Sequence, residues 1–274
     1  MKKNSNVDFK MSDLPKNRKE LFFDIFKNQT RALIFLAMVA FLIVLPFILV
    51  RYYNLLSIDG IIESNLQDSE KQSRIQEMTL YTSLICLVLC ILASIFSAGI
   101  FRIIKQLSFN EGFLFGPSFL KGIKENIKDF SVTFLIIGLV NLLVEMVTIR
   151  FAFSNSLIYY LLKAIFVLII IPIILTSLVV CSIYSDKLIK KIFVSVTIFF
   201  KYLHLILLAY LIVVAPLLVM IIPNTFIQLF YPMIYAMLYL PFAIIIFYLF
   251  VNHCLDKLIN QKSFPELYQK GLFH

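Results

Sequence analysis

The stretch IFVLIIIPIILTSLVV, residues 165–180, decides the fold class of this 274-residue chain. It is apolar without alternation, which predicts a helix rather than a strand of a membrane β-barrel. A bilayer core is about 30 Å thick and takes about 20 mostly apolar residues per helix. Such stretches recur, and the predicted spans are 32–50, 80–101, 130–149, 157–184, 202–222 and 229–251. We therefore expect an all-α polytopic membrane protein with six transmembrane helices arranged as three hairpins.

The overall composition supports this class. The chain is 61% hydrophobic and only 15% charged, whereas soluble domains are about 45 to 50% apolar and about 25% charged. A soluble fold of this length would have no core large enough for so much apolar surface. The chain then divides into an N-terminal segment of residues 1–31, a membrane domain of residues 32–251 and a tail of residues 252–274.

The distribution of positive charge predicts the orientation. Of the 25 Lys and Arg residues, 20 fall in four segments on one side of a six-span path: 1–31, 102–129, 185–201 and the tail. Short positive loops stay in the cytoplasm, so we expect both termini to be cytoplasmic, in a bacterial inner membrane. The high pI then reflects topology, and no nucleic-acid partner is expected. The partners expected instead are the lipid bilayer, with anionic lipid at the cytoplasmic face, and other membrane subunits.

Two basic segments before odd-numbered spans are amphipathic. In FGPSFLKGIKENIKDF the apolar residues Phe119, Ile123, Ile127 and Phe130 recur at helical spacing, between lysines. RKELFFDIFKNQTRALI repeats the pattern before the first span. Each is predicted either to lie in the cytoplasmic interface as an amphipathic helix or to extend its span into the cytoplasm.

A short pattern returns where even-numbered spans end. FRIIKQ begins at Phe101, DKLIKK at Asp186 and DKLINQ at Asp256. The echo suggests three copies of one unit, made of an interfacial helix, an outgoing span and a returning span. The alternative is that any basic exit from a bilayer produces such a pattern.

Polar residues within the spans indicate a candidate site. Glu145 in the third span and Lys163 in the fourth are each nine positions from residue 154, the expected midpoint of their hairpin. They are therefore predicted to meet at similar depth, with Arg150 as a rival partner and Asn141 one turn deeper on the same helical face. Three interpretations remain open: a structural ion pair, a substrate or proton site, and side chains that extend to the outer surface.

Prolines lie inside four spans, and each removes a backbone hydrogen bond. They predict bends, or the wall of a binding cavity; the residues are Pro46, Pro172, Pro216 and Pro241.

No catalytic signature is present. The sequence has no phosphate-binding glycine loop, no HExxH and no GxSxG motif, and its cysteines have no neighbouring ligands for a metal. We expect no enzyme, cofactor or metal site. The function favoured is a non-enzymatic accessory or assembly partner of a membrane system, and the alternative is a small transporter or channel using the Glu145 and Lys163 region. A lipid-modifying enzyme within the membrane is the third hypothesis, which the missing signatures disfavour.

Two blocks carry a resemblance to a known family. AGIFRIIKQLSFNEGFLFGPSFLKGIKENIKDF, residues 98–130, and FVNHCLDKLINQKSFPELYQKGL, residues 250–272, are similar to segments of the YesL-like family of small bacterial multi-pass membrane proteins. The two quoted blocks together make up about a fifth of the chain. It implies an association with carbohydrate uptake systems and carries over no catalytic residue.

Overall fold

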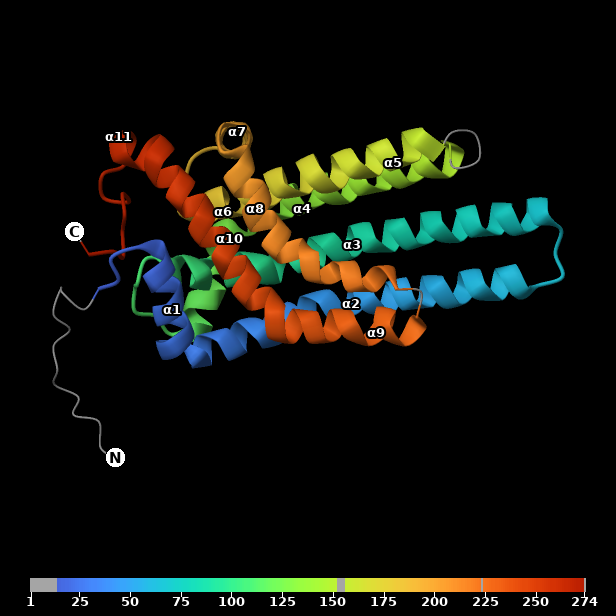
Figure 1. The fold of residues 1–274 in the computed structure, drawn as a ribbon, viewed down its shortest axis with the longest axis horizontal. Helices are drawn as coiled ribbons and strands as arrows, with labels where there is room; N and C mark the ends of the chain where they lie inside the picture. Colours follow the sequence, from blue (N-terminus) through green and yellow to red (C-terminus); the bar gives the residue numbers. More distant parts are fainter. Residues whose placement is uncertain (1–13, 152–155, 223, 274) are drawn as a thin grey trace, which may run out of the picture.

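The computed structural model describes residues 14–151, 156–222 and 224–273, and the described chain is helical apart from short links (Figure 1). The elements are α1 (Arg18–Asn28), α2 (Thr30–Glu63), α3 (Asp68–Ser108), α4 (Phe115–Phe151), α5 (Ser156–Ile165), the π-helix η2 (Phe166–Ile170), α6 (Ile171–Ile183), α7 (Leu188–Lys201), α8 (Leu203–Val214), the 3₁₀-helix η3 (Ala215–Ile221), α9 (Thr225–Ile234), the π-helix η4 (Tyr235–Tyr239), α10 (Leu240–Leu255), the π-helix η5 (Asp256–Asn260) and α11 (Gln261–Ser263).

The predicted fold class is confirmed. Within the described residues, six helices are long and apolar enough to cross a membrane, and they overlap the six predicted spans. The helices run along the long axis of the molecule as three successive hairpins (Figure 1). The two described ends of the chain lie together, because the amide of Phe273 donates to the carbonyl of Pro15 at 2.9 Å.

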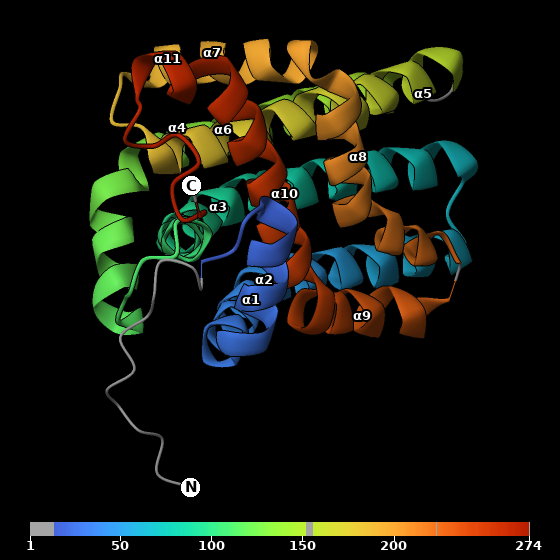
Figure 2. The ribbon, with the colours of Figure 1, turned by 60° about the vertical axis from the view of Figure 1, so that its left-hand side comes forward.

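Three helical segments lie across one end of the bundle. These are α1, the first part of α4 and α7, and each leads into an outgoing helix of a hairpin (Figure 2). Ile189, Phe193 and Phe200 are exposed on α7, and Phe23 and Phe26 are exposed on α1. This end, called the basic end below, therefore has the transverse amphipathic helices predicted before the first and third spans, and a third before the fifth.

The first hairpin is much longer than its predicted spans. The sequence suggests that residues 54–78 form a short helical excursion over the outer face. Instead α2 continues to Glu63, α3 begins at Asp68, and the helices project as one pair (Figure 1). Between Pro46 and Glu63 the helix contains no further proline, and most residues there favour or tolerate helix. The charged residues within 54–78, which the sequence suggests belong to a connecting excursion, are thus the solvated part of two long helices.

Small residues allow α3 and α4 to cross closely at the basic end. A Cβ added to Gly122 would lie 2.4 Å from Cβ of Arg102, and one added to Gly99 would lie 2.4 Å from the Phe119 ring. Deeper in the pair, the hydroxyls of Ser94 and Ser131 lie 2.9 Å apart. Close approach of this kind is how transmembrane helices gain packing energy without a hydrophobic driving force.

The prolines perturb the returning helices in a repeated way. The π-helix η2 ends two residues before Pro172, and η4 ends two residues before Pro241. Pro46, by contrast, lies inside a continuous α-helical assignment. A π-helix that ends two residues before a proline thus occurs in both the second and the third hairpin. This correspondence supports the hypothesis of a repeated unit.

At Pro216 the lost helical hydrogen bond is replaced in a different way. It lies at the start of η3, and a proline leaves the carbonyl four residues earlier, here that of Ile212, without its helical donor. The Tyr239 hydroxyl donates to that carbonyl at 2.8 Å. Tyr235 donates to the carbonyl of Val213 at 2.6 Å, and Tyr231 to that of Pro216 at 2.7 Å. Three tyrosines at helical spacing therefore bind the carbonyls around the distortion.

Ion pairs at the basic end join the three units, which are residues 18–108, 115–183 and 188–260. The pairs are Arg18–Asp256 at 2.8 Å, Arg102–Glu125 at 2.7 Å and Lys191–Asp129 at 2.5 Å. Each pair joins a different combination of two units, so the three close into a ring. Arg102, Lys191 and Asp256 come from the three copies of the echoed pattern.

The echoed segments nevertheless differ in structure. FRIIKQ continues α3, and DKLIN forms the π-helix η5 after α10. DKLIKK does not extend the fourth span, because α6 ends at Ile183 and α7 begins at Leu188. There the echo marks the start of the next transverse helix.

Candidate functional site

The two charged residues singled out within the spans form an ion pair. Lys163 on α5 donates from Nζ to Oε1 of Glu145 on α4 at 2.5 Å. The side chains remain 34% and 20% exposed. Asn141 is half-buried one turn before Glu145. Arg150 lies outside the residues whose side chains the structure describes.

The hairpin that carries this pair is poorly covered by the rest of the chain. Apart from the adjoining η2, the helix with which α5 makes extensive contact is α4. Large apolar side chains around the pair are exposed, among them Leu143, Met146 and Leu161. The two charges neutralise each other, so a substrate could use either group only by separating them.

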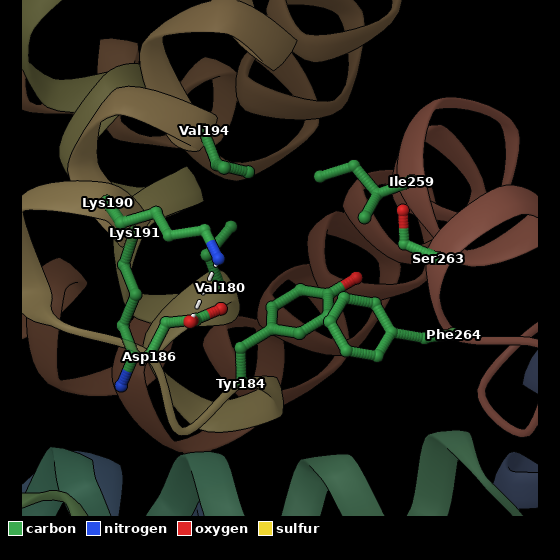
Figure 3. Close-up of a pocket in the computed structure, with 9 residues that line it drawn as sticks. All are labelled: Val180, Tyr184, Asp186, Lys190, Lys191, Val194, Ile259, Ser263 and Phe264. Carbon is green, nitrogen blue, oxygen red and sulfur yellow. Dashed lines mark hydrogen bonds and ion pairs between the residues drawn. The ribbon is translucent and has the colours of Figure 1, made fainter.

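A second candidate is a small pocket at the basic end, with a volume of about 170 Å³ (Figure 3). Val180, Val194, Ile259 and Phe264 give it largely apolar walls, and the rings of Tyr184 and Phe264 lie 5.3 Å apart. Its charged groups are already paired.

Lys190 donates to Asp186 at 3.0 Å on the rim of this pocket. The side chain of Lys191 points away from that of Lys190 (Figure 3). Its buried ammonium donates to Asp129 of α4 at 2.5 Å. The pocket can therefore receive an apolar group but presents no free charge from these residues.

A hydrogen-bonded chain runs behind the pocket and links Tyr184, the residue after α6, to η5 and α1. The Tyr184 hydroxyl donates to Asn260, and Asn260 donates from Nδ2 to Oδ1 of Asp256 at 2.8 Å. Arg18 donates to the other oxygen of Asp256 at 2.8 Å. Burial raises the pKa of Tyr184, and the nearby Asp256 carboxylate raises it further, so this hydroxyl stays protonated and serves as a donor.

The groups in this network are suited to a structural role, because they hold helices together and are already paired. Its carboxylate is held by a guanidinium and an amide, and its hydroxyl has an acceptor. No nucleophile and base face each other in it. In the described parts of the chain, no three His, Cys, Asp or Glu residues lie close enough together to hold a metal ion.

Comparisons with protein-family models, with curated proteins and with solved structures found no match.

Spacing in the sequence does not reveal most of these polar contacts. Arg18 and Asp256 are 238 positions apart, and nothing local marks them as partners. The tyrosine contacts were also missed, although Tyr231, Tyr235 and Tyr239 recur every four residues in the span that follows Pro216. Tyrosine at helical spacing opposite a proline in the preceding span is the signal that could have located them.

Proposed function

We propose that this protein is a non-enzymatic accessory or assembly subunit of a membrane system, and that the system is a carbohydrate uptake system of a bacterial inner membrane. In this proposal the basic end faces the cytoplasm, in accord with the positive-inside rule.

The observation that carries this proposal is the α2–α3 extension, defined as residues 49–82. Helices of 34 and 41 residues are about 51 and about 62 Å long at 1.5 Å per residue, against a bilayer core of about 30 Å. None of residues 49–82 is buried. Helices draw most of their stability in proteins from packing of an apolar face, and the two helices of this pair cover each other only in part.

The exposed side chains of the extension favour a protein partner. Tyr53, Leu56 and Ile62 are large, apolar and exposed on α2, beyond or at the end of its predicted span. Exposed apolar residues away from lipid are typical of interaction sites. The choice of carbohydrate uptake rests on the resemblance of residues 98–130 and 250–272 to the YesL-like family.

Site-specific photo-crosslinking in cells tests this function. A photoreactive residue replaces Leu56 or Ile62 in the extension, and as a control it replaces Met38, which is exposed on the membrane-spanning part of the same helix. We expect a discrete crosslinked product from the extension positions that contains an uptake-system subunit, and none from Met38. In parallel, Leu56→Asp with Ile62→Asp is expected to reduce sugar accumulation while amino-acid accumulation is unchanged. Unchanged sugar accumulation together with no specific product would overturn the proposal.

The alternative is a small transporter or channel that uses the hairpin of α4 and α5. It is favoured by the Glu145–Lys163 pair, which lies within two spans and remains partly exposed. The double variant Glu145→Gln with Lys163→Met removes both charges and leaves neither unpaired. An accessory subunit would keep its function in this variant, whereas a transporter that depends on the pair would lose flux in proteoliposomes.

A further inference from the structure

A second, larger hollow opens where α3 ends and α4 begins. It has a volume of about 500 Å³ and is called the α3–α4 pocket here. Arg102 and Gln106 line it from α3, Lys121 and Ser118 line it from α4, and Phe113 and Leu114 come from the link between the helices. It lies at the basic end, because its lining residues come from the end of α3, the start of α4 and the link between them.

The charges around this pocket favour an anion. Arg102 and Lys121 both contact Glu125, at 2.7 Å and 3.8 Å. One carboxylate cannot neutralise two cations, and Lys124 and Lys128 follow on the same helix. A concave site with excess positive charge concentrates anions.

Two buried polar atoms belong to residues of the pocket wall. Nε of Arg102 and Oε1 of Gln106 have no hydrogen-bond partner among the described residues. Buried polar atoms are nearly always paired with protein, water or ligand. A guanidinium N–H requires an acceptor such as a phosphate oxygen, and an amide oxygen requires a donor such as a hydroxyl. A ligand with both a phosphate and hydroxyl groups would match the two.

Apolar side chains at the mouth indicate that this ligand is a lipid. Leu114 lines the pocket and is 74% exposed, and Leu120, which directly precedes Lys121 on α4, is 66% exposed. Apolar residues beside lysines on a helix across the bundle end are typical of contact with the boundary between headgroups and acyl chains. A soluble phosphate would gain nothing from these leucines.

We propose that the α3–α4 pocket binds the phosphate of an anionic phospholipid whose headgroup carries hydroxyl groups, in the leaflet at the basic end. Arg102 and Lys121 hold the phosphate, Gln106 accepts from a headgroup hydroxyl, and Leu114 and Leu120 contact the acyl chains.

Binding of short-chain lipids to the purified, delipidated full chain in detergent tests this site, with native mass spectrometry as the readout. The probes are dioctanoyl phosphatidylglycerol, dioctanoyl phosphatidic acid, dioctanoyl phosphatidylcholine and inorganic phosphate. Lys121→Ala is the main variant, because Lys121 is exposed and its loss should not disturb folding. Lys124→Ala is the matched control, since it removes one positive charge from the same helix without touching the pocket.

We expect phosphatidylglycerol to bind more tightly than phosphatidylcholine, and Lys121→Ala to weaken phosphatidylglycerol about tenfold, as for loss of one charge-assisted hydrogen bond. Lys124→Ala should leave the affinity for phosphatidylglycerol within about twofold. Phosphatidylglycerol should also bind more tightly than phosphatidic acid, and Gln106→Leu should remove this preference. Equal weakening by Lys121→Ala and Lys124→Ala would indicate diffuse attraction and overturn the site. Inorganic phosphate that competes as well as the lipid would overturn the lipid assignment.

Discussion

Arg18 Nη2 and Asp256 Oδ2 lie 2.8 Å apart, although 238 positions separate the two residues. The side chains are 11% and 5% exposed. Arg18 also donates to the carbonyls of Ser108 and Lys270, at 3.0 Å and 3.2 Å. One guanidinium thus fixes the first transverse helix to the last span, to the end of α3 and to the C-terminal segment.

Loss of this guanidinium should destabilise the protein strongly. Arg18→Ala leaves the buried Asp256 carboxylate without its counter-ion, which costs about 3 to 5 kcal/mol in other buried pairs. The measurement is the thermal unfolding midpoint in detergent. Arg74→Ala is the control, because its pair with Glu70 is exposed and worth about 0 to 1 kcal/mol. Equal shifts for the two variants would show that Arg18–Asp256 does not secure the bundle.

The close crossing of α3 and α4 predicts a large effect from a single methyl group. Gly122→Ala places a Cβ 2.4 Å from Cβ of Arg102 and 2.9 Å from the carbonyl oxygen of Ala98. Overpacking of this kind costs about 1 to 3 kcal/mol, so the thermal midpoint should fall. Gly116→Ala on the same helix meets nothing within 4 Å and should be neutral or slightly stabilising. If Gly122→Ala is also neutral, the helices do not approach as closely as described.

The link between Tyr239 and Pro216 is testable by a double-mutant cycle. Tyr239→Phe removes the donor to the Ile212 carbonyl and should cost about 0.5 to 1.5 kcal/mol. In a Pro216→Ala background the amide of residue 216 can supply that donor, so the same change should cost clearly less. Thermal midpoints of the four proteins give the coupling energy. Additive effects would mean that the hydroxyl does not replace the lost helical bond.

The small pocket of Figure 3 should accept a larger apolar side chain. Val194→Phe extends a wall of this hollow of about 170 Å³ and should raise stability by about 0.5 to 2 kcal/mol, as cavity filling commonly does. Ile198→Phe, one turn further along α7 at a fully buried position, should lower stability. A fall in the thermal midpoint for Val194→Phe would show that the pocket has no room for the ring.

Long apolar runs explain why the fold class was predictable. An unpaired backbone group is very costly in hydrocarbon. A continuous apolar run such as 165–180 therefore forms a helix, in which its backbone groups are hydrogen-bonded to one another. The α2–α3 extension was misread because charged residues mark the end of a span without marking the end of a helix. Only propensity and the absence of proline decide how far the helix continues, and that signal is weak.

The polar contacts also differ in how far the sequence could predict them. Glu145 and Lys163 could be placed together by counting from their hairpin midpoint, since a tight antiparallel pair fixes the register. Arg18 and Asp256 come from the first and last units, so their meeting depends on the packing of all three hairpins. Repeated patterns located Arg102, Lys191 and Asp256 at one end of the bundle but gave no information on which residues they face.

The short distance between Phe273 N and Pro15 O has a consequence for connectivity. Because the two ends of the described chain meet, a short linker from residue 273 to residue 15 would close the polypeptide into a circle. Opening that circle in the link between α3 and α4 would give a circular permutant that begins with the second unit and ends with the first. Each unit crosses the membrane twice, so every permutant opened between units would keep its termini on the original side.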